Sequence, residues 1–449
     1  MLVSALYMLN QCCVLFNEWL AVPTTILFFG AALFLTFKTG VAQIRALPRF
    51  WYLIRKSYAA QERQAGNPQA RANTISPFHA LFTAMATTIG IGNVVGPSIA
   101  IFAGGPGALL WLLIYLFFGS VTKFVEVTFA LHTRTRIGAD HVIGGPMQYL
   151  KLIHPALARW YVMVMVFLFM AWSGLQANTL ASIVALENIS AVWVGIVLAL
   201  SVYGVVSGGA RRVGVVASTI VPVMFVLYIC FALGILWFSR EQFIPVIRMM
   251  FTAAFTPSAI ASGLIGASII RAMHAGIFRG IYISEAGLGT SSIAHSVADV
   301  NRSVDQGVLA MVSMVSDACL ALLSGLIVLV TGVWHHGQFR STFVYEAFAS
   351  HAPVFGRVVL IVSIALFALT TVIGNSFNGM QTFLYITNRR WGMWYLTCTM
   401  FAIMAGALLP VAFMWNAMDV LLTLVAVPNL IGIILLACRY PQVLSLKSE

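Results

Sequence analysis

Two glycine clusters interrupt apolar stretches of this chain, one at Gly90–Gly92 and the other at Gly263–Gly266. Where a helix unwinds, the N–H groups that begin one half carry partial positive charge and suit a carboxylate. The C=O groups that end the other half carry partial negative charge and suit a cation. Because glycine has no side chain, a ligand can approach its backbone closely. Both clusters therefore have the chemistry to bind a zwitterion together with an ion.

At the first cluster the backbone groups can be assigned separate roles. We predict that the N–H groups of Ile91 and Gly92, with the amide of Asn93, hold a carboxylate. The carbonyls of Ala86 and Ile89, at the end of the preceding half-helix, are predicted to face a cation. The predicted substrate-binding residues of the two clusters are Gly90, Ile91, Gly92, Asn93, Gly263 and Gly266.

Close packing is the alternative explanation for these glycines, because glycine is common where membrane helices touch. For one cluster alone, packing would be the better interpretation. The clusters, however, begin the first helix of each of two matching halves, and Pro97 follows one of them closely. Interrupted helices at equivalent positions of two halves are typical of the central site of a transporter. We therefore favour unwinding.

The elements that carry these clusters are membrane helices. Of 449 residues, 60% are hydrophobic and 8% are charged, against about 25% charged in an average soluble protein. A helix needs about 20 apolar residues to cross a bilayer. The chain supplies eleven such stretches, near residues 16–37, 78–102, 107–132, 157–186, 191–207, 213–238, 256–278, 304–332, 354–386, 392–412 and 415–437. The predicted fold class is thus an all-α membrane protein.

The spans divide into one extra helix and two sets of five. Because each set is odd, the second set starts from the opposite side, which makes an inverted repeat. The predicted domains are an N-terminal helix at 1–38, a basic cytoplasmic linker at 39–76, repeats at 77–238 and 239–437, and a cytoplasmic tail at 438–449.

Lys and Arg residues set the predicted orientation. With the segment after the first span placed inside, twenty of the 25 basic residues lie on the cytoplasmic side and four outside, Lys123 being within a span. Cytoplasmic loops of membrane proteins are enriched in these residues. We predict a protein integral to the cytoplasmic membrane, with the N-terminus outside and the C-terminus inside.

Several other classes are disfavoured. The net charge of +12 is spread over short loops and forms no basic face for nucleic acid. A nucleophile–base motif of an intramembrane enzyme is missing, and so is the repeated filter or charged ring of a channel. The expected partners are the lipid bilayer and a small amino acid, with no organic cofactor; the oligomeric state is left open, a monomer included.

A family resemblance rests on motifs in order along the chain. They are Gly90–Pro97, Gly104–Ala108, Thr122–Val127, Gly144–Leu150, Gln176–Asn178, Arg279–His295, Asp305–Gly307 and Pro428–Leu430. With these motifs the chain resembles the alanine or glycine:cation symporter family. The resemblance implies a LeuT-like five-plus-five inverted repeat preceded by one extra helix. It also implies sodium- or proton-coupled uptake of alanine or glycine.

The resemblance also implies roles for polar residues. Thr370 and Thr371 stand where LeuT-like transporters supply hydroxyls to sodium, so the predicted cation ligands are Ala86, Ile89, Thr370 and Thr371. Gln176 is implied to line the substrate site. Asn375 replaces an aromatic residue of similar proteins, which predicts a wider or more polar pocket. Ile91 replaces a hydroxyl residue, so one side-chain contact is lost.

Lys123, Glu126 and Asp317 are ionisable residues inside predicted spans. Glu126 is three residues from Lys123, a spacing that favours an ion pair on one helical face. Asp317 is interpreted as an acid that is hydrogen-bonded to a broken helix or protonated by burial, in preference to a proton or cation relay.

Cation-coupled symport of a small neutral amino acid, with sodium as the coupling ion, is the function predicted from these features. The alternative is a proton-coupled or exchange-type transporter of the same fold with a larger or more polar substrate.

Overall fold

The computed structural model describes residues 2–64, 77–137, 141–255, 267–300, 302–335, 342–387 and 391–446. The helices are α1 (Leu2–Lys38), α2 (Ala42–Arg45), α3 (Leu47–Gln64), α4 (Pro77–Thr88), α5 (Ile91–Gly104), α6 (Gly107–His132), α7 (Pro146–Tyr149), α8 (Pro155–Val184), α9 (Ala191–Val206), α10 (Gly209–Phe238), α11 (Arg240–Phe255), α12 (Ala267–Ser284), α13 (Thr290–Ser296), α14 (Ser303–Thr331), α15 (Phe343–His351), α16 (Phe355–Ile386), α17 (Gly392–Leu408) and α18 (Val411–Arg439). Short 3₁₀ turns lie at Leu150–Leu152, Ala185–Glu187, Val333–His335 and Pro441–Leu444. The strands β1 (Thr135–Ile137) and β2 (His141–Ile143) pair antiparallel.

Helices of membrane-spanning length recur through the described ranges. The predicted all-helical membrane fold is thereby confirmed. Eight segments there are long and apolar enough to cross a bilayer, one of them made of α4 and α5 together. The shorter apolar helices α9 and α17 add two further candidates. Helix α12 overlaps the seventh predicted span, 256–278, whose first part, 256–266, lies outside the described residues.

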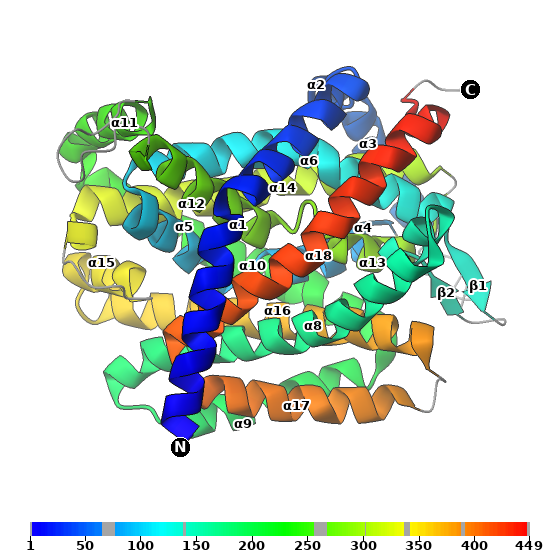
Figure 1. Cartoon of the computed structure of the whole chain (residues 1–449). Helices are drawn as coiled ribbons and strands as arrows, with labels where there is room; N and C mark the ends of the chain where they lie inside the picture. Colours follow the sequence, from blue (N-terminus) through cyan, green and yellow to red (C-terminus); the bar gives the residue numbers. More distant parts are fainter. Residues whose placement is uncertain are drawn as a thin grey trace.

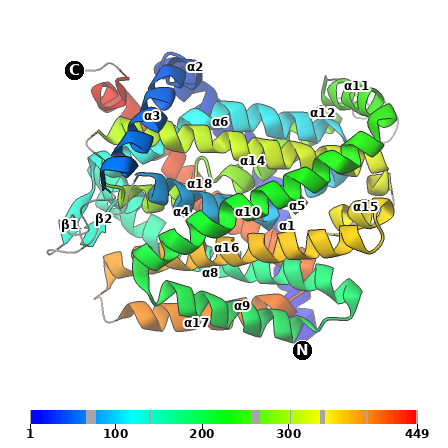
Figure 2. The ribbon, with the colours of Figure 1, turned by 180° about the vertical axis from the view of Figure 1, so that it is seen from behind.

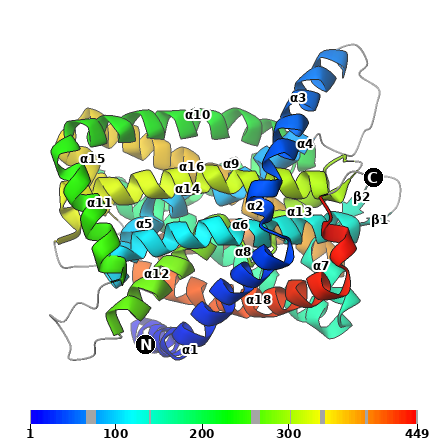
Figure 3. The ribbon, with the colours of Figure 1, turned by 90° about the horizontal axis from the view of Figure 1, so that it is seen from above.

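The long helices form a bundle with two distinct ends. Helices α6, α10, α14 and α16 run side by side between these ends (Figures 2 and 3). At one end lie α11 and α15, and at the other lie β1, β2 and the C-terminus (Figure 1). The predicted linker at 39–76 contains α2 and α3, because residues 42–64 are helical.

Helix α1 packs across the outside of the bundle, where it crosses α18 (Figure 1). Two amide contacts join these helices: Asn17 Nδ2 donates to the carbonyl of Asn416, and Asn416 Nδ2 donates to Asn10 Oδ1. Amide hydrogen bonds of this kind hold membrane helices together because lipid offers no competing partner. The extra N-terminal helix is thereby fixed to the last helix of the chain.

Two helices are interrupted within the part of the chain that the structure describes. The first divides into α4 and α5 at Ile89–Gly90, as the sequence predicts. The second divides into α12 and α13 at Glu285–Gly289. The predicted break at Gly263 and Gly266 lies outside the described residues. The break at Glu285–Gly289 was not predicted from the sequence.

Candidate functional site

Asn93 holds the first break open. The Gly90 N–H, which would bond the Ala86 carbonyl in an unbroken helix, donates to Asn93 Oδ1 at 3.0 Å. The Asn93 N–H donates back to the Gly90 carbonyl at 3.1 Å. The Ile89 N–H still donates to the Met85 carbonyl at 2.7 Å, so the helical bonding of α4 continues up to Ile89. The break therefore releases the Ala86 carbonyl from its helical partner while the chain around it stays ordered.

The two glycines of this break are required by close neighbours. A Cβ at Gly90 would collide with the side chain of Thr371 on α16, and one at Gly92 would lie 2.5 Å from Tyr282 Cε1 on α12. Distances this short are far inside van der Waals contact, so only glycine fits at either position. Hence α16 and α12 lie directly against the broken helix.

Thr371 and Thr370 lie in different environments. The Thr371 hydroxyl donates to the Ile89 carbonyl at 3.3 Å, which brings two predicted cation ligands together. The Thr370 hydroxyl instead lies against the Leu366 and Phe367 carbonyls of its own helix, at 3.0 and 3.1 Å, and Met224 Sδ on α10, at 3.5 Å. It is not directed toward Ile89, and bonding of a threonine to its own helix is common in membrane helices. The predicted pair of hydroxyls is thus reduced to Thr371.

The amide of Asn93 is engaged at both ends. Its Oδ1 accepts from Gly90, and its Nδ2 donates to Asp317 Oδ1 on α14 at 3.3 Å. Asn93 is fully buried; its amide, predicted to hold a carboxylate, has its oxygen and one of its two Nδ2 hydrogens bonded to other groups. The interpretation of Asp317 as an acid bonded to a broken helix agrees with this geometry. At the first break the N–H groups of Ile91 and Gly92 remain as donors at the start of α5.

The second break is longer and is fastened by several side chains. Gly287 and Gly289 adopt positive φ of 97° and 76° there, and Glu285 also has a positive φ of 59°. Tyr115 on α6 donates to the Ala286 carbonyl at 2.8 Å, and Tyr161 on α8 donates to the Leu288 carbonyl at 2.6 Å. Backbone carbonyls that an unbroken helix would bond internally are thus bonded by fixed side chains.

Glu126 and Asn429 complete this fastening. Glu126 Oε1 accepts from the Gly287 N–H at 3.1 Å and from Asn429 Nδ2 at 2.6 Å. Asn429 Nδ2 also donates to the Gly287 carbonyl at 2.8 Å. The predicted Glu126–Lys123 ion pair is therefore wrong, because Glu126 is used to hold the second break.

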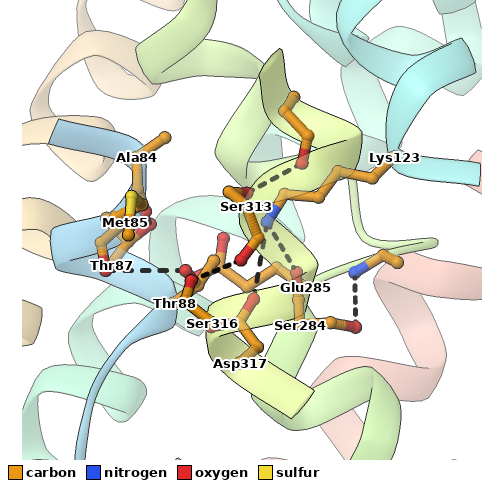
Figure 4. A network of polar contacts seen from close by, with 12 residues as sticks. Ala84, Met85, Thr87, Thr88, Lys123, Ser284, Glu285, Ser313, Ser316 and Asp317 are labelled. Atoms are coloured by element: carbon orange, nitrogen blue, oxygen red, sulfur yellow. Dashed lines mark hydrogen bonds and ion pairs between the residues drawn. The ribbon is translucent and has the colours of Figure 1, made fainter. Parts of the chain in front are cut away.

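Lys123 instead reaches the end of α12. Its Nζ donates to the Ser284 carbonyl at 3.2 Å and lies 3.9 Å from Asp317 Oδ2 (Figure 4). Both side chains are almost wholly buried, at 1% and 0% exposure. Glu285 is also buried and accepts from the Thr290 hydroxyl. Charged groups are costly inside a membrane unless they are paired. The contact between Lys123 and Asp317 offsets part of that cost.

Four buried amides lie on α8 and α16: Gln176, Asn178, Asn375 and Asn378. The Nδ2 of Asn178 is bonded to the carbonyls of Gly406 and Leu409. Within the part of the chain that the structure describes, both polar atoms of Asn375 and Asn378 and the Oε1 of Gln176 have no hydrogen-bond partner. Buried polar atoms without partners are rare in proteins and are expected where a ligand or water completes the site.

The amides of α16 lie close to the first break. A Cβ at Gly374, one residue before Asn375, would lie 3.2 Å from the backbone nitrogen of Thr87 on α4. Thr371, one helical turn earlier than Asn375, contacts Ile89. Residues four apart share a helical face. Asn375 therefore follows Thr371 along the face of α16 that meets the broken helix.

An aromatic layer covers the other side of the break. The ring centroids of Trp172 and Tyr282 are 5.0 Å apart, and those of Tyr282 and Trp415 are 5.1 Å apart. Arg279 donates to both oxygens of Asp419, at 2.9 and 2.5 Å, and its guanidinium lies 5.0 Å from the Trp415 ring. This layer was not predicted from the sequence, and Arg279 lies within α12. The only indication of this layer in the sequence is Gly92, whose missing side chain leaves room for Tyr282.

Comparisons with known proteins agree with this architecture. The sequence profile of the sodium:alanine symporter family matches residues 6–445. The chain is 32% identical to an uncharacterized transporter of Haemophilus influenzae, over 92% of this chain and 90% of that protein. It is 30% identical to the sodium/alanine symporter AgcS of Methanococcus maripaludis, over 92% and 91%.

The fold also matches a solved structure. The crystal structure of MhsT in complex with L-phenylalanine superposes with a TM-score of 0.62 at 13% identity, over 82% of this chain and 89% of that one. The prediction of a transporter instead of an enzyme is confirmed by the family match. From its profile, its relatives and its interrupted helices, we conclude that this chain is an integral membrane transporter that belongs to the sodium:alanine symporter family.

Proposed function

We propose that this protein imports a small neutral amino acid, such as alanine or glycine, together with sodium. The observation that carries the proposal is the contact between Thr371 and Ile89 at a helix break. There the released carbonyl of Ala86, the carbonyl of Ile89 and the Thr371 hydroxyl offer oxygen ligands to a hard cation. Unwound carbonyls of this kind coordinate sodium in transporters with interrupted helices.

The substrate carboxylate binds the N–H groups of Ile91 and Gly92 at the start of α5. These groups carry the positive end of the helix dipole, which attracts an anion. Sodium on the carbonyl side and the carboxylate on the N–H side then lie within one short segment. Their opposite charges stabilise each other, which couples the binding of one to the binding of the other.

We also propose that the N-terminus lies outside the cell and the C-terminus in the cytoplasm. Helices α2 and α3, the β1–β2 hairpin and the C-terminus lie toward one end of the bundle, whereas α11 and α15 lie at the other (Figure 2). An excess of Lys and Arg at one end favours the cytoplasmic side. We further propose eleven spans arranged as five plus five inverted helices after α1, in the cytoplasmic membrane.

A second candidate is a carrier of a larger or more polar amino acid, coupled to protons or working by exchange. The unpartnered amides of Asn375 and Asn378 favour this substrate class. A polar substrate side chain would complete their hydrogen bonds, whereas alanine would leave them to water. We rank it second because the amides bear only on the choice of substrate, whereas the proposed cation ligands are the same for both candidates.

Uptake into proteoliposomes separates the two candidates. We expect accumulation of alanine or glycine to rise with an inward sodium gradient and to be insensitive to a proton gradient. Competition by each of the twenty amino acids, with and without sodium, then defines the substrate. Uptake that follows pH and ignores sodium contradicts the first proposal. Preferential competition by polar amino acids with amide side chains, lost in Asn375→Ala, would favour the second substrate class.

A further inference from the structure

Lys123 is a buried cation that the proposed transport site does not use. It lies on α6, which belongs to neither interrupted helix, and its side chain is 1% exposed. Bringing an ammonium into a low-dielectric interior is costly unless other groups replace its water. The groups that do so here are a backbone carbonyl and a carboxylate, at Ser284 and Asp317.

The carbonyl is available because of the second break. In an unbroken helix the Leu288 N–H would bond the Ser284 carbonyl, but it donates to the backbone carbonyl of Glu285 at 3.1 Å instead. The C-terminal carbonyls of a helix carry partial negative charge and attract cations. Lys123 Nζ occupies that position at 3.2 Å. The end of α12 is thus bound by a cation that the protein itself supplies.

The neighbouring acids differ in their contacts. Glu126 is engaged by Gly287 and Asn429, and Glu285 by Thr290. Asp317 Oδ2 and Glu285 Oε1 both lack a hydrogen-bond donor in the described ranges, but the ion pair of Lys123 is with Asp317, whose Oδ2 lies 3.9 Å from the ammonium. Among the described acids, Asp317 is therefore the one paired with Lys123.

The same network reaches the first break. Asp317 Oδ1 accepts from Asn93 Nδ2, and Asn93 Oδ1 accepts from the Gly90 N–H. One series of contacts therefore joins the carbonyl that ends α12 to the amide released by the break between α4 and α5. The first break offers carbonyls to a mobile ion, whereas the second is bound by a tethered one.

We propose that the Lys123 ammonium is a built-in cation at the second break, which takes the place of a second coupling ion. Transport then carries a single sodium ion with each amino acid. This inference rests on the proposed sodium coupling and adds the number of ions. Lys123 acts as a positioning residue, because it holds the two breaks in register and does not touch the substrate.

The wild-type stoichiometry is the first measurement. In proteoliposomes, the ratio of sodium-22 influx to amino-acid influx and the reversal potential should both give one ion and one charge per zwitterion. Two charges per zwitterion would overturn the inference while leaving sodium coupling intact. Uptake without any sodium dependence would instead contradict the proposed function itself.

Lys123→Met, with the exposed Lys151→Met as a matched control, gives the second measurement. Removing the ammonium leaves Asp317 and the Ser284 carbonyl unpaired, and a second sodium ion can occupy that position. We expect the sodium dependence of uptake to change from hyperbolic to sigmoidal, with the number of interacting sites rising from one to two. The apparent sodium affinity should fall roughly tenfold or more, because a buried pair is broken. Lys151→Met should match the wild type.

Lys123→Arg retains a cation at this position and is expected to keep the hyperbolic sodium dependence. A sigmoidal curve for Lys123→Arg contradicts the inference. So does a Lys123→Met protein that loses only maximal rate and keeps its sodium affinity and hyperbolic curve. Should Lys123→Met fail to fold, the wild-type stoichiometry and Lys123→Arg still decide the matter.

Discussion

The two helix breaks differ in how their backbone groups are used. At Ile89–Gly90, the Ile89 carbonyl is met by one hydroxyl, from Thr371, and the Gly90 N–H by one side-chain amide, from Asn93. At Glu285–Gly289 the backbone is bound by the side chains of Lys123, Tyr115, Glu126, Tyr161 and Asn429. The first break therefore keeps groups available for ligands, whereas the second is closed by the protein.

This difference indicates a division of work. A break that must bind and release an ion in each cycle needs weakly held ligands. A break that is bound by buried tyrosines and a buried ion pair is rigid and can serve as the fixed wall of the site. The stability of the fold should therefore depend more on the second break, and ion affinity on the first.

Asp317→Ala is expected to have the largest effect on this comparison. It leaves the Lys123 ammonium buried without a counter-charge, which costs about 3–5 kcal/mol. Asp305→Ala on the same helix is the control, because its pair with Arg49 is partly exposed and contributes about 1 kcal/mol or less. Thermal unfolding in detergent should show a large fall in Tm for Asp317→Ala only. Equal Tm values for the two variants would contradict a structural role for the buried pair.

Gly90→Ala should come next. The added Cβ would collide with the Thr371 side chain, and overpacking of this kind costs about 1–3 kcal/mol. Because the displaced groups are the proposed sodium ligands, we expect uptake to fall about tenfold to a hundredfold. Gly30→Ala on α1 is the control, since a Cβ there meets open space. Normal uptake by Gly90→Ala would place the cation elsewhere.

Tyr161→Phe tests the second break with a smaller change. It removes the donor to the Leu288 carbonyl, and a buried carbonyl left without a partner costs about 1–3 kcal/mol. We expect a lower Tm with an unchanged apparent sodium affinity. Tyr203→Phe, at an exposed position on α9, should leave both values unchanged. A reduced sodium affinity in Tyr161→Phe without loss of stability would remove the distinction between the breaks.

The first break could be predicted from sequence because its signal is local. Glycines at 90 and 92 stand in an apolar run, and the backbone chemistry of an unwound helix follows from that alone. The same rule led to Gly263–Gly266 and missed Gly287 and Gly289, which were assigned to a loop between spans. Positive φ angles distinguish these glycines from packing glycines, and φ cannot be read from composition.

Side-chain partners were harder to predict than elements. The spacing of Lys123 and Glu126 favours a pair on one helix, yet each binds a group brought close by the tertiary fold. The contact of Arg279 with Asp419 joins residues that are 140 positions apart. Local spacing carries no information about such contacts. Thr370 and Thr371 are adjacent and identical in type, and only the rotation of α16 decides which one meets the break.

That rotation gives the smallest expected effect and a direct test of the ion site. Thr371→Ala removes a hydroxyl beside the Ile89 carbonyl, and the loss of one such ligand is worth about 1 kcal/mol. We expect the apparent sodium affinity to fall roughly fivefold, with substrate affinity at saturating sodium unchanged. Thr370→Ala is the matched control, since its hydroxyl bonds Leu366 and Phe367 of its own helix. If Thr370→Ala weakened sodium binding as much as Thr371→Ala, the ion would have to lie between both hydroxyls, and α16 would have to turn during the cycle to present them.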